Sequence, residues 1–131
     1  MELRYRWMQR KDFNFIRNNF SSTKDFDHIF KNKKIIANIV EQDGNVVGWI
    51  AYRLFENNIK IVKFVFKNEQ IFDFILSKLV LKSISNIDID ISEYDLKMHL
   101  LLKNSEFKAV SSIKVNDVYF YKFSKQIKIM A

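Results

Sequence analysis

The residues best suited to acid–base chemistry form a run of carboxylates in the second half of the chain. Asp88 and Asp90 alternate with isoleucines, and Glu93 and Asp95 follow closely. A carboxylate can take a proton from a nucleophile directly or through a water molecule. The alternative interpretation is a solvated strand face followed by a helix start, because helix N-termini favour negative charge. Both interpretations place these residues near the end of one strand.

Other residue types exclude several kinds of site. The chain has no cysteine, which excludes disulfides, thiolate metal sites and cysteine nucleophiles. The two histidines, His28 and His99, lie far apart without ligand spacing, which favours surface or half-buried histidines. Residues 88–99 resemble a calcium loop, but Glu93 stands where that loop needs glycine and His99 where it needs glutamate. No metal site is therefore predicted.

Charge is spread unevenly along the 131 residues. The net charge is +7, with +5 over residues 1–34, −3 over residues 35–96 and +5 over residues 97–131. Such basic ends could attract nucleic acid or a polyanionic cofactor, and the alternative is that they serve solubility alone. No apolar run approaches the roughly 20 residues of a membrane helix, and the start does not resemble a signal peptide. We expect a cytoplasmic protein with no membrane partner.

Apolar periodicity and turn residues predict one α/β domain over residues 1–131. The expected strands cover residues 3–7, 34–42, 46–54, 59–66, 87–91, 107–115 and 118–123. The expected helices cover residues 11–20, a segment around 26–30, 69–85 and 93–103. The strongest local signal is Asp43-Gly44, which favours a tight hairpin turn between two strands. This order predicts a mixed, mostly antiparallel sheet with helices on both faces.

Three short stretches carry a resemblance to a known family. Residues 6–12 read R-W-M-Q-R-K-D, residues 41–49 read E-Q-D-G-N-V-V-G-W, and residues 106–110 read E-F-K-A-V. They resemble the first strand and helix, the hairpin, and the G-F-K-x-V stretch of the GNAT acetyltransferases, with Glu106 where that family has glycine. The small bacterial enzymes that acetylate protein N-termini are the most similar in element order. The resemblance implies a GNAT fold, with acetyl transfer from acetyl-CoA to a primary amine.

In that family a glycine-rich loop after the fourth strand binds the pyrophosphate of acetyl-CoA at a helix N-terminus. Residues 66–75 of this chain hold no glycine and no arginine, and Glu69 and Asp73 add negative charge. The resemblance implies that the cofactor binds at the end of the fourth strand and the start of the next helix. It also implies a contact at the position after the fifth strand where the family often has asparagine. These residues are Phe64, Phe66, Lys67, Asn68 and Asp95.

The family also places a tyrosine that acts as the general acid on its last helix, five residues before the phenylalanine of G-F. That position is Leu102 here, while Tyr94 is expected on the same helix. The candidate catalytic residues are therefore Asp90, Glu93 and Tyr94. Two functions remain open: an acetyl-CoA-dependent amine acetyltransferase, or an inactive GNAT-fold module. An inactive module would bind a protein partner, a second copy of the chain or nucleic acid.

Overall fold

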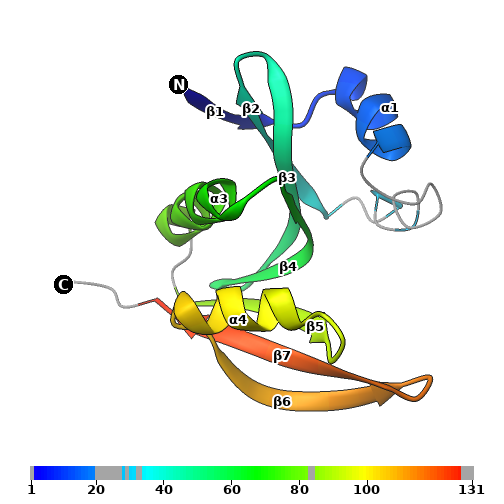
Figure 1. Cartoon of the computed structure of the whole chain (residues 1–131), viewed down its shortest axis with the longest axis vertical. Helices are drawn as coiled ribbons and strands as arrows, with labels where there is room; N and C mark the ends of the chain where they lie inside the picture. Colours follow the sequence, from blue (N-terminus) through cyan, green and yellow to red (C-terminus); the bar gives the residue numbers. More distant parts are fainter. Residues whose placement is uncertain (1, 20–27, 29, 32–33, 83–84, 128–131) are drawn as a thin grey trace. The chain divides into compact units, whose positions relative to one another are not determined.

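The computed structural model describes residues 2–19, 28, 30–31, 34–82 and 85–127 (Figure 1). The strands are β1 (Leu3–Trp7), β2 (Ile36–Gln42), β3 (Asn45–Phe55), β4 (Asn58–Phe66), β5 (Asn86–Ser92), β6 (Lys108–Val115) and β7 (Val118–Gln126). The helices are α1 (Arg10–Asn19), α3 (Glu69–Lys82) and α4 (Leu96–Asn104). The expected helix around residues 26–30 lies mostly outside the described residues.

The seven strands are hydrogen-bonded in the order β1-β2-β3-β4-β5-β7-β6. The pairs β1–β2, β2–β3, β5–β7 and β6–β7 are antiparallel. Strands β4 and β5 run parallel and pair over Asn58–Ile61 and Asn86–Ile89. The mixed, mostly antiparallel sheet predicted from the sequence is confirmed.

The chain divides into two compact units. The first unit holds residues 1–53 and 62–76, and the second unit holds residues 54–61 and 77–131. Strands β3 and β4 and helix α3 each contribute residues to both units. The single domain over residues 1–131 stays a prediction.

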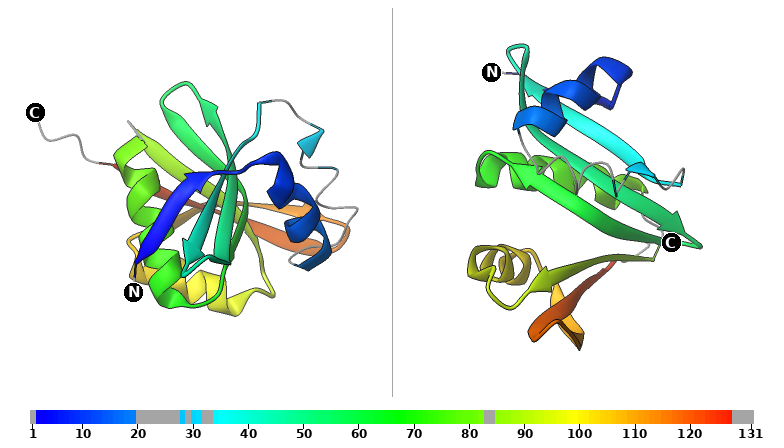
Figure 2. Two further views of the ribbon diagram at one scale, coloured as in Figure 1. Left: turned by 90° about the horizontal axis from the view of Figure 1, so that it is seen from above. Right: turned by 90° about the vertical axis from the view of Figure 1, so that its right-hand side faces the viewer.

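In the first unit, helices lie on both faces of β3. Trp49 and Ala51 of β3 are buried in one cluster with Ile16 of α1. Gly48 faces the opposite side, because a β-carbon there would lie 2.8 Å from Ile71 of α3. Figure 2 shows α1 and the start of α3 on opposite sides of β2 and β3. The predicted helices on both faces are therefore confirmed within this unit.

The hairpin between β2 and β3 has the predicted tight turn. Asp43 and Gly44 form the turn, and both have positive φ angles, of 53° and 82°. Two positive φ values at adjacent positions are what a type I′ turn requires, and Gly and Asp tolerate them better than most residues. This prediction is confirmed.

The core of the second unit lies between β5, β7 and α4. The three isoleucines of β5 are buried, whereas Asp88 and Asp90 lie on the other face of the strand. The buried residues that accompany the isoleucines are Met98, Leu101, Leu102, Phe107 and Phe123. Figure 1 shows α4 running along β5 and β7. The alternation of isoleucine and aspartate in the sequence thus corresponds to the buried and polar faces of β5.

Helix α4 begins later than the sequence suggests. Residues Glu93 and Tyr94 form a turn, and the side chain of Asp95 accepts a hydrogen bond from the Met98 N–H at 3.3 Å. Asp95 is therefore the N-cap of a helix that begins at Leu96. The prediction of a helix from residue 93 is wrong, so Tyr94 precedes the helix rather than lying on it.

Helix α4 ends in a Schellman motif. The N–H of Glu106 donates to the carbonyl of Lys103 at 3.2 Å, and the N–H of Phe107 donates to the carbonyl of Leu102 at 2.9 Å. Glu106 has a φ of 70°, the left-handed conformation that this motif demands. The family glycine that Glu106 replaces would adopt this conformation without strain.

Helix α3 departs from the sequence expectation at its end. Ile71, Phe72, Ile75 and Leu79 are buried, as expected for a helix that is apolar over most of its circumference. Leu81 is 81% exposed, however, so the expectation of burial fails there. None of the described helices is both long and apolar enough to cross a membrane.

Candidate active site

The end of β4 belongs to an aromatic cluster in the first unit. The rings of Phe64, Phe66 and Phe72 lie with centroids 5.1–5.2 Å apart. Phe72 is fully buried, and Phe64 and Phe66 are half-buried. Because these rings pack on one another, the polar groups that β4 can offer a ligand here are those of its backbone.

The start of α3 is capped by a side chain of the chain itself. Asn68 Oδ1 accepts a hydrogen bond from the Ile71 N–H at 3.1 Å. The N–H groups of Glu69 and Gln70 in the first turn have no intrahelical acceptor, as in any α-helix. Lys67 is exposed, and its N–H donates to the Val47 carbonyl at 2.9 Å. An anion at this helix start would thus meet two N–H groups, one lysine and one glutamate.

The predicted catalytic carboxylates already have partners in the second unit. Asp90 forms an ion pair with Lys60 at 2.8 Å, although its side chain is 49% exposed. Glu93 Oε2 accepts a hydrogen bond from the Tyr119 N–H at 2.6 Å, and the Glu93 N–H donates to the Tyr119 carbonyl at 2.8 Å. Glu93 therefore fastens the end of β5 to the start of β7.

Tyr94 differs from these carboxylates. Its side chain is 72% exposed, and its hydroxyl has no hydrogen bond among those found in the described part of the chain. Its backbone N–H donates to Ser92 Oγ at 3.2 Å. Glu93, Tyr94 and Asp95 thus lie together after β5, whereas Asp90 lies on the polar face of that strand.

Sequence reasoning did not select His99, which lies beside these residues. His99 Nε2 is 2.9 Å from the carbonyl oxygen of Ser92. The imidazole meets the rings of Tyr121 and Phe123 edge-on, with centroid distances of 5.6 and 5.0 Å. These partners come from β5 and β7, so no sequence spacing around His99 could reveal them. Its position one turn before Leu102 was the only available signal.

Arg6 joins three elements of the first unit. Its guanidinium donates to both carboxylate oxygens of Asp12, at 2.7 and 2.9 Å, and to Glu41 Oε1 at 2.7 and 2.9 Å. These hydrogen bonds hold the pKa of Asp12 below its usual value and raise the pKa of Arg6. Burial raises the pKa of Tyr5 on the same strand. The Arg6–Asp12–Glu41 network lines a cavity of about 410 Å³.

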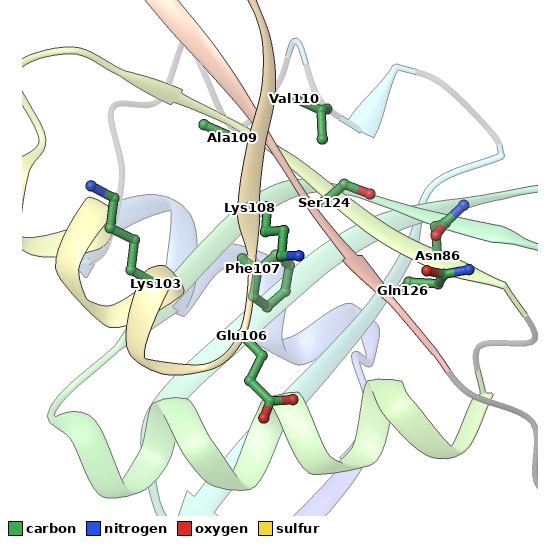
Figure 3. A pocket seen from close by; sticks show the side chains of 9 residues that line it. All are labelled: Asn86, Lys103, Glu106, Phe107, Lys108, Ala109, Val110, Ser124 and Gln126. Carbon is green, nitrogen blue, oxygen red and sulfur yellow. The ribbon is translucent and has the colours of Figure 1, made fainter.

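A second cavity, of about 970 Å³, lies in the second unit where β6 starts and β7 ends (Figure 3). Its lining residues are Asn86, Lys103, Glu106, Phe107, Lys108, Ala109, Val110, Ser124 and Gln126. The predicted catalytic residues do not line it. Among the described residues, no group of three or more histidines, aspartates and glutamates could hold a metal ion.

Among the comparisons with known proteins, only the comparison with solved structures finds matches. No family model and no curated protein sequence matches the chain. The ribosomal-protein-S18-alanine N-acetyltransferase of Escherichia coli matches with a TM-score of 0.75 and 9% identity, over 99% of this chain and 97% of that chain. Spermidine/spermine N-acetyltransferase SpeG of Vibrio cholerae matches with a TM-score of 0.72 and 12% identity, over 95% and 92%.

A GNAT-family protein from Desulfovibrio desulfuricans matches over 97% of this chain and the whole of its own, with a TM-score of 0.73 and 9% identity. All three similarities span nearly the full length of both chains. At such low identity they report the arrangement of helices and strands rather than the chemistry of the site. The chain therefore has the fold of the GNAT acetyltransferases.

Proposed function

We propose that this chain is an N-acetyltransferase that moves an acetyl group from acetyl-CoA to a primary amine. The observation that carries the proposal is the near-complete structural match to two enzymes whose acceptors are amines, a protein N-terminus and a polyamine. The function rests on analogy of fold, so the residues present must also suit the cofactor.

In the first unit, we infer that the start of α3 binds the cofactor phosphates with fewer backbone contacts than a glycine-rich loop would supply. The N–H groups of Glu69 and Gln70 lack intrahelical acceptors, and Lys67 supplies a positive charge beside them. Glu69 opposes this by placing negative charge in the first turn. Together with the backbone of Phe64 and Phe66, these groups fit a phosphate ligand that binds more weakly than at a glycine-rich loop.

The second unit supplies polar groups for the amine. Asp90 and Glu93 carry negative charge that attracts an ammonium group, while Tyr94 offers an exposed hydroxyl. Asp95 orders the start of α4 through its cap and takes the place of the family asparagine. When bound, acetyl-CoA supplies the activated thioester, and the chain must orient the amine and manage its proton.

Two charge changes at the start of α3 test the cofactor half of the proposal. Lys67→Ala should weaken acetyl-CoA binding by about threefold, because an exposed charge contribution is below about 1 kcal/mol. Glu69→Gln should strengthen binding by a similar factor, because it removes repulsion at a helix N-terminus. Lys114→Ala on β6 is the matched control and should leave affinity unchanged, since Lys114 pairs with Asp117 at 3.8 Å and is not among the residues proposed to bind the cofactor.

The activity itself is tested by measuring thiol release from acetyl-CoA with a panel of amines. The panel should contain spermidine and a peptide with an N-terminal alanine, with a peptide acetylated at its N-terminus as the negative control. Amine-dependent thiol release supports the proposal. Binding of acetyl-CoA without transfer to any amine, or no binding at all, would instead favour the inactive partner-binding module.

A further inference from the structure

Strand β7 extends beyond the strand that pairs with its outer edge. Strand β6 begins at Lys108, which lies opposite Ser124, whereas β7 continues to Gln126. On the other edge β5 still pairs with this end of β7, because Asn86 lies opposite Gln126. The last residues of β7 therefore have a neighbouring strand on one edge only.

The hydrogen bonds to β5 identify which backbone groups of β7 face its outer edge. The Tyr119 carbonyl accepts from the Glu93 N–H, and the Ile127 N–H donates to the Ser85 carbonyl, both at 2.8 Å. Successive residues of a strand direct their backbone groups to alternate edges, so odd-numbered residues of β7 face β5 and even-numbered residues face β6. The N–H and carbonyl of Gln126 thus point to the edge that β6 leaves open. No partner for them is found in the described part of the chain.

The end of α4 explains why β6 starts late. In the Schellman motif, the N–H groups of Glu106 and Phe107 bond to carbonyls of the last helical turn. Residue 106 would lie opposite Gln126 if β6 were two residues longer, but the helix end holds it instead. Lys125 Nζ donates to the Ser105 carbonyl at 2.9 Å, which fastens this loop to β7. The open edge is therefore a fixed feature of the fold.

The cavity of about 970 Å³ lies at this open edge, and all its lining residues belong to the second unit. Its volume is within the range of about 300–1,000 Å³ that is usual for ligand sites. Figure 3 shows Lys108, Ser124, Asn86 and Gln126 gathered on one side of the strands, whereas Glu106 points away from them. No ion pair of the described residues includes Lys108. The cavity thus combines an open backbone edge with one uncompensated positive charge.

We propose that this cavity binds a short extended peptide with its C-terminal carboxylate at Lys108, an inference that does not depend on the proposed function. The peptide adds a strand to the open edge of β7: one of its N–H groups donates to the Gln126 carbonyl, and one of its carbonyls accepts from the Gln126 N–H. A peptide in line with β6 runs antiparallel to β7, so its C-terminus is the end nearest Lys108. The carboxylate there accepts a charge-assisted hydrogen bond from Lys108 Nζ.

The first test titrates the full chain, labelled with ¹⁵N, with the N-acetylated peptide Ala-Val-Ala-Val carrying a free C-terminus. The acetyl cap prevents the peptide from acting as an acceptor amine. The backbone N–H signals of Gln126 and of Ala109, which lines the cavity, should shift and saturate with a Kd of about 1 mM. Unchanged signals at both residues, or saturable shifts confined to other parts of the chain, would overturn the proposal.

Two variants test the two contacts separately. Gln126→Pro removes the N–H that faces the cavity but no hydrogen bond of the sheet, so it should weaken binding about 3–10-fold, read from the Ala109 signal. Lys108→Ala should weaken binding of the peptide with a free C-terminus about threefold and leave binding of its C-terminal amide unchanged. Lys114→Ala is the matched control, because Lys114 lies on the same strand outside the cavity, and it should bind both peptides as wild type does.

The comparison of the two peptides decides the charge contact. Equal affinity of wild type for the free and the amidated peptide would overturn the assignment of the carboxylate to Lys108. Equal affinity of wild type and Gln126→Pro for the free peptide would overturn the strand pairing. Thermal unfolding shows whether Gln126→Pro keeps the wild-type fold; if it does not, the result for Lys108→Ala with the two peptides decides the proposal.

Discussion

At the scale of single residues, Glu106 occupies a backbone position that suits glycine. Its φ of 70° closes the Schellman motif of α4, where a β-carbon is strained. We predict that Glu106→Gly stabilises the chain by about 1 kcal/mol, which urea denaturation would measure. Glu106→Ala is the control: it also removes the weak contact with Lys125, at 4.0 Å, but retains the β-carbon. Equal stabilisation by both variants would contradict this explanation.

The two glycines of the chain provide a matched pair of positions. A β-carbon on Gly48 would lie 2.8 Å from Ile71 Cγ2 and 2.9 Å from the Val65 carbonyl oxygen. Gly48→Ala should therefore destabilise the chain by about 1–3 kcal/mol through overpacking against α3. Gly44→Ala meets no atom within 4 Å and should cost only the strain of its positive φ, about 1 kcal/mol. Thermal unfolding that ranks Gly44→Ala as the more damaging change would disprove the close approach.

At the scale of elements, the Arg6–Asp12–Glu41 network links β1, α1 and β2. Asp12 is nearly buried and also accepts a hydrogen bond from the Gln9 N–H at 2.7 Å, which closes the first turn of α1. Removing one partner leaves a partly buried charge without its counterpart. Arg6→Met should therefore cost about 2 kcal/mol or more, because hydrogen bonds to charged groups are the strong ones.

The same network makes the free energy of unfolding depend on pH in the acidic range. Because Arg6 lowers the pKa of Asp12, the ionised carboxylate stabilises the folded chain above the ordinary pKa of aspartate, about 3.9. This stabilisation is lost as the pH falls through the lowered pKa. Denaturation measured from pH 7 to pH 2 should show a decline that is smaller in Asp12→Asn. Parallel curves for the two proteins would show that Asp12 does not contribute.

The elements were predictable from local pattern, and their ends were not. Asp43-Gly44 and the alternation of β5 each encode one element through adjacent residues. The start of α4 was misjudged because Glu93 is bound to Tyr119, which is distant in sequence. The contacts of His99 likewise come from two strands, so its surroundings are not visible in the sequence around it. Contacts between distant segments decide these details, and periodicity does not report them.

At the scale of the whole molecule, the GNAT fold forms from a sequence that has little identity with the structures it matches. The chain shares 9–12% identity with acetyltransferases whose fold it matches along nearly its full length. Turn residues and apolar alternation indicate most of the strands, whereas the order of the strands in the sheet comes from the structure. The fold thus forms in a chain whose residues 66–75 contain no glycine and whose residue 102 is leucine. The activity therefore has to be established by direct measurement, because one fold supports many functions.

Calorimetric titration of the full chain with acetyl-CoA tests most directly whether the protein binds this cofactor. We expect one binding event per chain, with a Kd below about 1 mM, equivalent to about −4 kcal/mol or more favourable. This affinity should fall in Lys67→Ala and rise in Glu69→Gln. The absence of binding heat and of any thermal shift at millimolar acetyl-CoA would contradict the proposed acetyltransferase function.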